Sequence, residues 1–173
     1  YKLSDLIVDA ELAKTFEQGE FATLYLSPKD YHRIHMPIDG RLVKMTYVPG
    51  RLFAVNPTST TYVSNLFARN ERVVCQFETT AGKMIIVLVG ALFVGSIHTS
   101  WAGKVTPNHT HQIQHFDYSE KNIEFKKGGQ LGHFELGSTV IMVFETQKIN
   151  WLSRLKTGKS IQFGQKIGDC LKN

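Results

Sequence analysis

The sequence has little cysteine and no long apolar run, and each absence excludes a class of protein. Its two thiols, Cys75 and Cys170, cannot form the disulfide framework of a small secreted scaffold, so we expect a reducing compartment. The strongest apolar run, Met84–Val89, is interrupted at Gly90 and is too short to cross a bilayer. No charged-then-apolar signal peptide opens the chain, which begins at Tyr1 rather than Met, and we expect a mature chain or a fragment.

A strong excess of one charge is also absent. The 20 Lys and Arg residues against 15 Asp and Glu leave a net charge of +5 over 173 residues. This modest excess suits an anionic membrane surface or nucleic acid and does not choose between them. Apolar residues make up 42% of the chain and charged residues 20%, which excludes wholesale disorder and predicts one globular domain with a real core.

The first 18 residues carry apolar side chains at steps of three and four. This spacing is typical of one face of an amphipathic helix, which we expect to end near Gly19. Such a stripe either packs on its own domain or lies on a lipid surface. The stripe consists of Leu3, Leu6, Ile7, Ala10, Ala13 and Phe16.

Short β segments follow, separated by turn signals such as Asp39-Gly40 and Ala81-Gly82. Their spacing predicts a mainly β protein, a sandwich or barrel-like domain preceded by the amphipathic helix. We also expect a helical turn within residues 59–70, and a short helix over Trp151–Lys159 before a hairpin built on Gly164 and Gly168. The predicted strands are Phe21–Leu26, Arg41–Tyr47, Leu52–Val55, Arg72–Thr79, Lys83–Val89, Phe93–His98 and Thr139–Phe144.

Two histidines, His32 and His35, follow the turn signal at residues 27–30. Three residues apart, they face one side if the backbone turns helically. Histidine titrates near neutral pH, so such a pair can transfer protons, although two ordinary loop histidines give the same pattern.

A second histidine group consists of His109, His111 and His115. On a strand all three side chains would point to one face, and His-x-His is a common metal-ligand spacing. No cysteine or diagnostic carboxylate accompanies them, so a polar strand or loop explains the spacing as well.

The glycine-rich stretch at 126–141 matches no common catalytic motif. A phosphate-binding loop requires a following helix and a Gly-Lys-Ser/Thr, and a nucleophile elbow requires Gly-x-Ser-x-Gly. Neither occurs here, and a Gly-Ser pair before an apolar strand is most often a turn.

Five blocks taken together resemble the phosphatidylserine decarboxylases. The resemblance runs in order over nearly the whole chain and ends with KIG at 166–168. Its most specific part is LGST, preceded upstream by YHRIHMP. The blocks are YLSPKDYHRIHMP (25–37), NLFARNER (65–72), VGALFVGSI (89–97), WAG (101–103) and KKGGQLGHFELGSTVI (126–141).

The resemblance implies a proenzyme that cuts itself between Gly137 and Ser138. Ser138 Oγ would attack the Gly137 carbonyl carbon, with His35 as the implied base, and elimination and hydrolysis would leave a pyruvoyl group derived from Ser138. That cofactor forms a Schiff base with the phosphatidylserine amine and acts as an electron sink while CO₂ leaves. His32 is the implied proton donor in forming phosphatidylethanolamine, and we expect His133 to be structural.

The same resemblance implies one decarboxylase domain over residues 1–173, cut into a β chain of 1–137 and an α chain of 138–173. The family's Ser-Pro-Val-Asp-Gly-like segment, whose aspartate orients the second histidine, is not found here, and Asp30 and Asp39 are poor substitutes. We therefore expect the N-terminal part of the family domain to be missing.

The substrate is a membrane lipid, so the expected partners are phosphatidylserine and an anionic membrane surface, with a homo-oligomer left open and no nucleic acid. The expected location is peripheral, on the cytoplasmic side of a bacterial membrane, with the mitochondrial inner membrane as the alternative. Two other functions stay open: a metal-dependent hydrolase that uses His109, His111 and His115, and a non-enzymatic β-barrel binding module.

Overall fold

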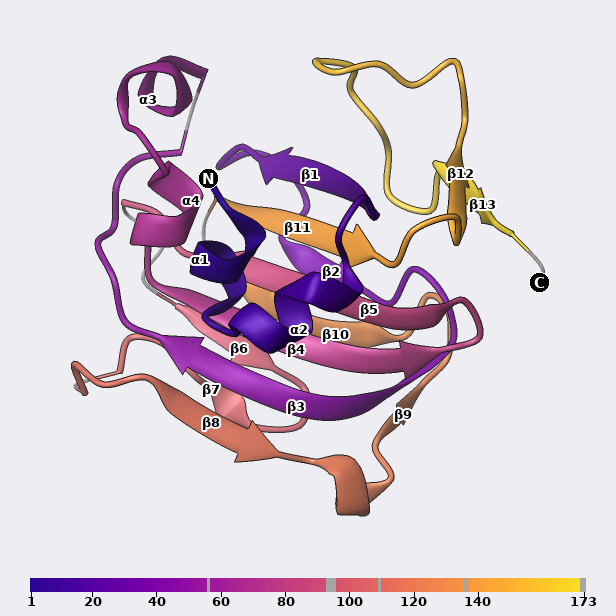
Figure 1. The fold of residues 1–173 in the computed structure, drawn as a ribbon. Helices are drawn as coiled ribbons and strands as arrows, with labels where there is room; N and C mark the ends of the chain where they lie inside the picture. The colour runs from indigo at the N-terminus through magenta and orange to yellow at the C-terminus, as the bar shows by residue number, and fades with distance from the viewer. Residues whose placement is uncertain (56, 93–95, 109, 136, 172–173) are drawn as a thin grey trace.

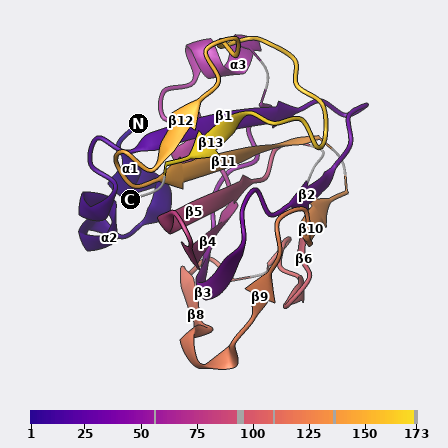
Figure 2. The same cartoon turned by 90° about the vertical axis from the view of Figure 1, so that its right-hand side faces the viewer.

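Antiparallel strands make up most of the structure, with short helices on one side (Figure 1). It is a computed structural model that describes residues 1–55, 57–92, 96–108, 110–135 and 137–171. A large sheet and a small sheet face each other, and the N-terminal helices cover the opposite side of the large sheet (Figure 2). The predicted mainly β fold is confirmed.

The large sheet follows the order β1-β11-β5-β4-β3-β8, so β1 lies at one edge and β8 at the other. β9 pairs with the beginning of β3, beside the place where β8 pairs with its middle. The β4–β5 hairpin turns at Gly82, whose φ of 86° favours glycine. The strands are β1 (Glu20–Leu26), β3 (Gly40–Val48), β4 (Arg72–Thr79), β5 (Gly82–Val89), β8 (Gln114–Asp117), β9 (Glu124–Phe125) and β11 (Ser138–Phe144).

The small sheet follows the order β2-β10-β6-β7, and a separate hairpin joins β12 to β13. β10 approaches β6 so closely that a Cβ on Gly132 would collide with the carbonyl oxygen of His98, so this position requires glycine. The strands are β2 (Arg33–His35), β6 (Ile97–Thr99), β7 (Gly103–Lys104), β10 (Gln130–Phe134), β12 (Ile149–Trp151) and β13 (Gly168–Cys170).

Both faces of the central strands β4 and β5 are largely buried, which explains their continuous apolar sequences. Met84, Ile86 and Leu88 of β5 belong to the core between the two sheets. The alternate residues Ile85 and Val87 belong to the core beneath the N-terminal helices. Alternation of side chains along the strand therefore divides one apolar run between two cores.

The predicted single N-terminal helix is wrong in its continuity, because the stripe forms two short helices over the middle of the large sheet (Figure 1). Val8 adopts a left-handed φ of 51°, and the Asp9 carboxylate then accepts a hydrogen bond from the Leu12 N–H as an N-cap. Leu6 and Phe16 are buried against the sheet. The helices of the chain are α1 (Leu3–Ile7), α2 (Ala10–Thr15), α3 (Pro57–Tyr62), α4 (Leu66–Arg69) and the 3₁₀ helix η1 (Ser119–Lys121).

Arg72, only 2% exposed, joins α1 to the large sheet. Its guanidinium donates to the carbonyl oxygens of Leu6 at 2.6 Å, Asp5 at 2.8 Å and Asn70 at 2.9 Å. Burial lowers the pKa of Arg72 to about 10, so the group remains charged at neutral pH. These bonds satisfy carbonyl groups at the end of a helix too short to satisfy them itself.

Several other predictions can be compared with the structure. Five of the seven predicted strands are confirmed within one residue at each end as β1, β3, β4, β5 and β11, and α3 and α4 confirm a helical turn in 59–70. The predicted strand Leu52–Val55 is wrong, because that segment is irregular. Of Phe93–His98, residues 93–95 lie outside the described part, and β6 begins at Ile97. The predicted helix Trp151–Lys159 is also wrong, because Trp151 lies in β12 and turns follow.

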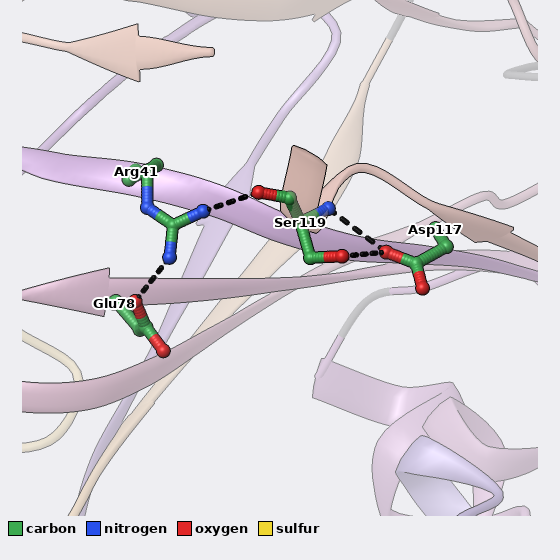
Figure 3. A network of polar contacts seen from close by, with 4 residues as sticks. All are labelled: Arg41, Glu78, Asp117 and Ser119. Carbon is green, nitrogen blue, oxygen red and sulfur yellow. Dashed lines mark hydrogen bonds and ion pairs between the residues drawn. The ribbon is translucent and has the colours of Figure 1, made fainter. Parts of the chain in front are cut away.

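A polar network connects strands β3, β4 and β8 to the 3₁₀ helix η1 (Figure 3). Arg41 of β3 donates to the Glu78 carboxylate of β4 at 2.6 Å and to the Ser119 carbonyl oxygen at 2.7 Å. The N–H and hydroxyl groups of Ser119 both donate to Asp117 Oδ1. The network attaches η1 to two central strands.

Candidate active site

Pairing of β1 with β11 brings together two motifs that are about a hundred residues apart. Their antiparallel register places Leu26 opposite Ser138, at the point where β1 ends and β11 begins. A Cβ on Gly137 would lie 3.3 Å from the Leu26 carbonyl oxygen and 3.3 Å from both the nitrogen and Cγ of Pro28. The Gly137–Ser138 peptide bond therefore lies against the segment that leads to the histidines.

His32 contacts Pro28, the residue against which Gly137 lies. Its Nε2 is 3.0 Å from the Pro28 carbonyl oxygen, which can only accept, so Nε2 carries a proton. Its backbone carbonyl accepts from the Phe134 N–H of β10 at 3.1 Å. Nδ1 is shielded from solvent and has no hydrogen-bond partner in the described part of the chain. In the neutral ring Nδ1 is the basic nitrogen, available to a group in the site.

His35 ends β2 and is fixed in the opposite tautomer. Its Nδ1 lies 2.8 Å from the Gly128 carbonyl oxygen, so Nδ1 carries the proton. Its Nε2 lies 2.8 Å from the Tyr31 hydroxyl and, in the neutral ring, accepts a hydrogen bond from it. Backbone bonds from Met36 to Gly128 and Gly129 attach the same turn to β2. His35 therefore has a basic nitrogen covered by one hydroxyl group.

An aromatic cluster surrounds His35. The Tyr31 ring stacks on it with centroids 5.7 Å apart, and the Phe163 ring lies 4.5 Å from His35 and 5.0 Å from Tyr31. Phe163 comes from the segment between β12 and β13, which passes above β1 (Figure 2). The cluster thus brings residues that precede the Gly137–Ser138 bond in the sequence into contact with one that follows it.

The carboxylates nearest to the histidines in sequence are occupied elsewhere. Asp30 Oδ2 accepts from the Ser27 N–H at 2.7 Å, within the turn after β1. Asp39 accepts from the Lys127 N–H at 2.7 Å and from Lys126 Nζ at 3.1 Å, and these bonds lower the pKa of Asp39. Asp39 thereby stabilises the turn that contains Gly128 and does not contact His35 directly.

The two histidines therefore do not share one face of a helical turn, since the segment is extended into β2. No sequence pattern indicated a role for Tyr31, Phe163 or the Gly128 carbonyl group. Tyr31 could have been suspected because it lies within the YHRIHMP block. Nothing in the sequence around Phe163 signals its contact with His35.

The second histidine group is not assembled into a metal site among the described residues. His115 lies in β8, where its Nδ1 is 3.0 Å from the Thr46 hydroxyl, while His111 lies outside any strand. His109 lies outside the described residues. His111 and His115 therefore do not lie on one strand face, as a metal site on a single strand would require.

His133 lies on β10 and stacks on His98 of β6, with ring centroids 4.5 Å apart. Burial, then the neighbouring His98 and Arg33, lowers the pKa of His133. His98 Nε2 is in turn 3.1 Å from the Glu135 carboxylate. These contacts fit the expected structural role of His133 in the small sheet.

Known proteins match nearly the whole chain. The sequence profile of the family described as phosphatidylserine decarboxylase matches residues 1–169. Similar curated proteins include the phosphatidylserine decarboxylase proenzyme of Nitrosococcus oceani, 51% identical over 99% of this chain and 56% of its own length. The proteins of the same name from Methylococcus capsulatus and Marinobacter nauticus are 46% and 50% identical, over 98% and 97% of this chain.

The chain spans 56 to 59% of the length of these relatives. No helix in the described ranges is long and apolar enough to cross a membrane. Because the profile match includes both the histidine block and the Gly-Ser block, the chain belongs to the phosphatidylserine decarboxylase family.

Proposed function

We propose that the protein containing this chain decarboxylates phosphatidylserine to phosphatidylethanolamine, after cutting itself between Gly137 and Ser138. Family membership supports the reaction class. The observation that carries the proposal is the β1–β11 register, which places the Gly137–Ser138 bond against Pro28, next to His32. Two motifs distant in sequence thereby form one site.

The self-cleavage step uses groups of this chain. Ser138 Oγ attacks the Gly137 carbonyl carbon, and the peptide C–N bond breaks to give an ester and a free amine. Removal of the Ser138 Cα proton then expels the Gly137 carboxylate with the former Oγ, and water hydrolyses the resulting enamine and releases ammonia. Both steps require a base, because a serine hydroxyl is a weak nucleophile at neutral pH.

The residues around this bond suit a pyruvoyl group formed from Ser138. Gly137 has no side chain to push Leu26 and Pro28 away, and the unpartnered Nδ1 of His32 is a buried polar atom that such a site can use. Bound to the substrate amine, a pyruvoyl group supplies an electron sink for loss of CO₂. The chain's own residues orient the head group and supply the proton that replaces the carboxylate.

By family resemblance, His35 is the base for self-cleavage and His32 is the proton donor in decarboxylation. His32 Nδ1, which has no hydrogen-bond partner among the residues that the structure describes, suits proton transfer in the site. For His35 to accept a proton from Ser138, the Tyr31 hydroxyl must leave Nε2 or relay the proton. The aspartate that orients His35 would come from outside this chain, because Asp30 and Asp39 are engaged elsewhere.

The same proposal includes a single decarboxylase domain cut into chains 1–137 and 138–173, which remain joined by β1–β11 and β11–β5 pairing. It also includes peripheral attachment to an anionic membrane surface, where the lipid substrate resides. The net charge of +5 supports that attachment.

Gel electrophoresis together with a lipid assay tests the proposal. The full-length protein should give two bands under denaturing conditions and convert phosphatidylserine, whereas Ser138→Ala should give one band and no product. A protein that remains uncut but releases CO₂ from phosphatidylserine at the same rate would contradict the scheme.

The two histidines are tested in the same assay. His35→Ala should remain uncut, while His32→Ala should be cut but decarboxylate at least about 100-fold more slowly, as is typical for loss of a general acid or base. His115→Ala, on the opposite edge of the sheet, is the matched control and should behave like the unmodified protein. If His32→Ala remains uncut and His35→Ala is cut, the two roles are reversed.

A further inference from the structure

An apolar cavity of about 780 Å³ opens on the face of β1 and β11 that carries the N-terminal helices. This volume lies within the range of about 300–1,000 Å³ found for ligand sites. Helices α1 and α2 cover the middle of the sheet and leave this edge open (Figure 1). The cavity walls include Leu6, Phe16, Phe21, Tyr25, Ile141 and Val143.

Exposed aromatic side chains lie along the open side of this cavity. Phe21 is 65% exposed and Tyr25 45% exposed, and both lie on the same face of the edge strand β1. Large apolar side chains gathered on one open surface mark an interaction site more often than single exposed ones do.

Thr139 supplies a polar group within the apolar wall. It is fully buried at 0% exposure, lines the cavity, and its Oγ1 has no hydrogen-bond partner among the residues that the structure describes. A buried hydroxyl without a hydrogen-bond partner is unfavourable, and a ligand oxygen in the cavity would supply the missing acceptor. Thr139 directly follows Ser138, so its backbone adjoins the proposed cleavage site at the beginning of β11.

The rim of the cavity is cationic. Thr157, from the segment between β12 and β13, lines the cavity, and three exposed basic residues of the same segment lie within three positions of it in sequence: Arg154, Lys156 and Lys159. These three form no ion pair within the described ranges, and residues 146–168 contain no Asp or Glu. A ligand with an apolar body and an anionic head fits both the wall and the rim.

We propose that this cavity binds one acyl chain of phosphatidylserine, with Thr139 Oγ1 donating a hydrogen bond to the ester carbonyl oxygen. This inference rests on the proposed function and extends it to the lipid tail. The head group then lies toward Ser138, and the cationic rim faces the lipid phosphate.

Chain-length dependence of turnover by the full-length protein is the first test. Thr23→Trp fills the cavity from an exposed position of β1, where Trp suits a strand. It should lower kcat/KM for dioleoyl-phosphatidylserine about tenfold more than for dihexanoyl-phosphatidylserine. Thr80→Trp makes the same substitution in the β4–β5 turn, outside the cavity, and should affect both lipids equally.

The hydroxyl is tested by a matched pair. Thr139→Val keeps the branched shape and should raise KM for dioleoyl-phosphatidylserine about 2–10-fold, the loss of one neutral hydrogen bond, while self-cleavage continues. Thr139→Ser restores the hydroxyl and should restore KM. Equal KM values in all three proteins, or equal losses for both lipids in Thr23→Trp, would overturn the proposal.

A binding measurement keeps the inference independent of catalysis. In the uncut Ser138→Ala protein, the fluorescence of Phe21→Trp should be quenched by phosphatidylserine that carries a nitroxide on its acyl chain. Phe116→Trp, on β8 at the opposite edge, is the control and should not be quenched. Quenching of both tryptophan variants, or of neither, would overturn the inference. Quenching of neither would indicate that another segment of the full-length protein fills the cavity. Loss of self-cleavage and turnover in the unmodified protein would instead refute the proposed function alone.

Discussion

The contact of Phe163 with Tyr31 and His35 gives a prediction whose size follows from the structure. Phe163 is 64% exposed, so about a third of a full phenylalanine burial remains, worth roughly 0.5–1 kcal/mol. Its two ring contacts, at 4.5 and 5.0 Å, each contribute about 0.5–1.5 kcal/mol more. Phe163→Ala should therefore lower the free energy of unfolding by about 1.5–4 kcal/mol.

A double-mutant cycle isolates the ring contact from the burial. Unfolding in urea of Tyr31→Ala, Phe163→Ala and the double variant, each in the uncut Ser138→Ala protein, should give a coupling of about 0.5–1.5 kcal/mol. The parallel cycle of Phe163→Ala with Phe116→Ala, on the opposite edge strand, should be additive within about 0.5 kcal/mol. Additivity in the Tyr31 cycle would refute the view that Phe163, in the segment after β12, packs on the Tyr31 ring.

Three further predictions concern the turn and sheet that support the site. Because the pKa of His133 is lowered in the folded protein, the unfolded chain binds a proton more readily, and the free energy of unfolding should fall as the pH drops below 6.5. Urea unfolding between about pH 7.5 and 5.5 should show a smaller loss of stability for His133→Gln than for the unmodified protein. An equal loss would contradict the direction of the pKa shift. Gly132→Ala should lower stability by roughly 1–3 kcal/mol, because the methyl group collides with the His98 carbonyl oxygen, and an unchanged urea midpoint would argue against that close approach. Asp39→Asn should increase hydrogen exchange at the Lys127 amide and slow self-cleavage, because the carboxylate that accepts from this amide is lost. Since the pKa of Asp39 is lowered in the folded protein, acid should destabilise the same turn only as the pH falls through that pKa. Unchanged exchange would show that Asp39 does not stabilise the turn.

The long strands could be predicted because their residues carry a strong local pattern. The β-branched and aromatic runs of β4 and β5 are bounded by turn residues, and both faces are buried. Strands of two or three residues, such as β7 and β9, carry no period and form only because a neighbouring strand pairs with them. Trp151, Leu152 and Leu155 have helix-like spacing, yet Trp151 pairs with Gly168 in a hairpin. Tertiary pairing outweighed the local pattern there.

The candidate site was predictable where a compact motif carries the chemistry. The Gly137–Ser138 bond and the histidines of the YHRIHMP block could be named from sequence, and in the structure Gly137 and His32 both lie against Pro28. The tautomers were not predictable, because they depend on the carbonyl oxygens of Pro28 and Gly128, which any residue could supply. The Phe163 contact depends on a long segment folding back over β1, which no periodicity indicates.

The mass of the smaller fragment tests the central claim most directly. Intact mass spectrometry of the full-length protein should show a fragment that begins at residue 138, whose first residue has lost its amino nitrogen and carries a ketone in its place. Ser138→Ala should show a single uncut mass. A decarboxylating protein whose fragment begins with an unmodified serine, or whose chain remains whole, would contradict the account.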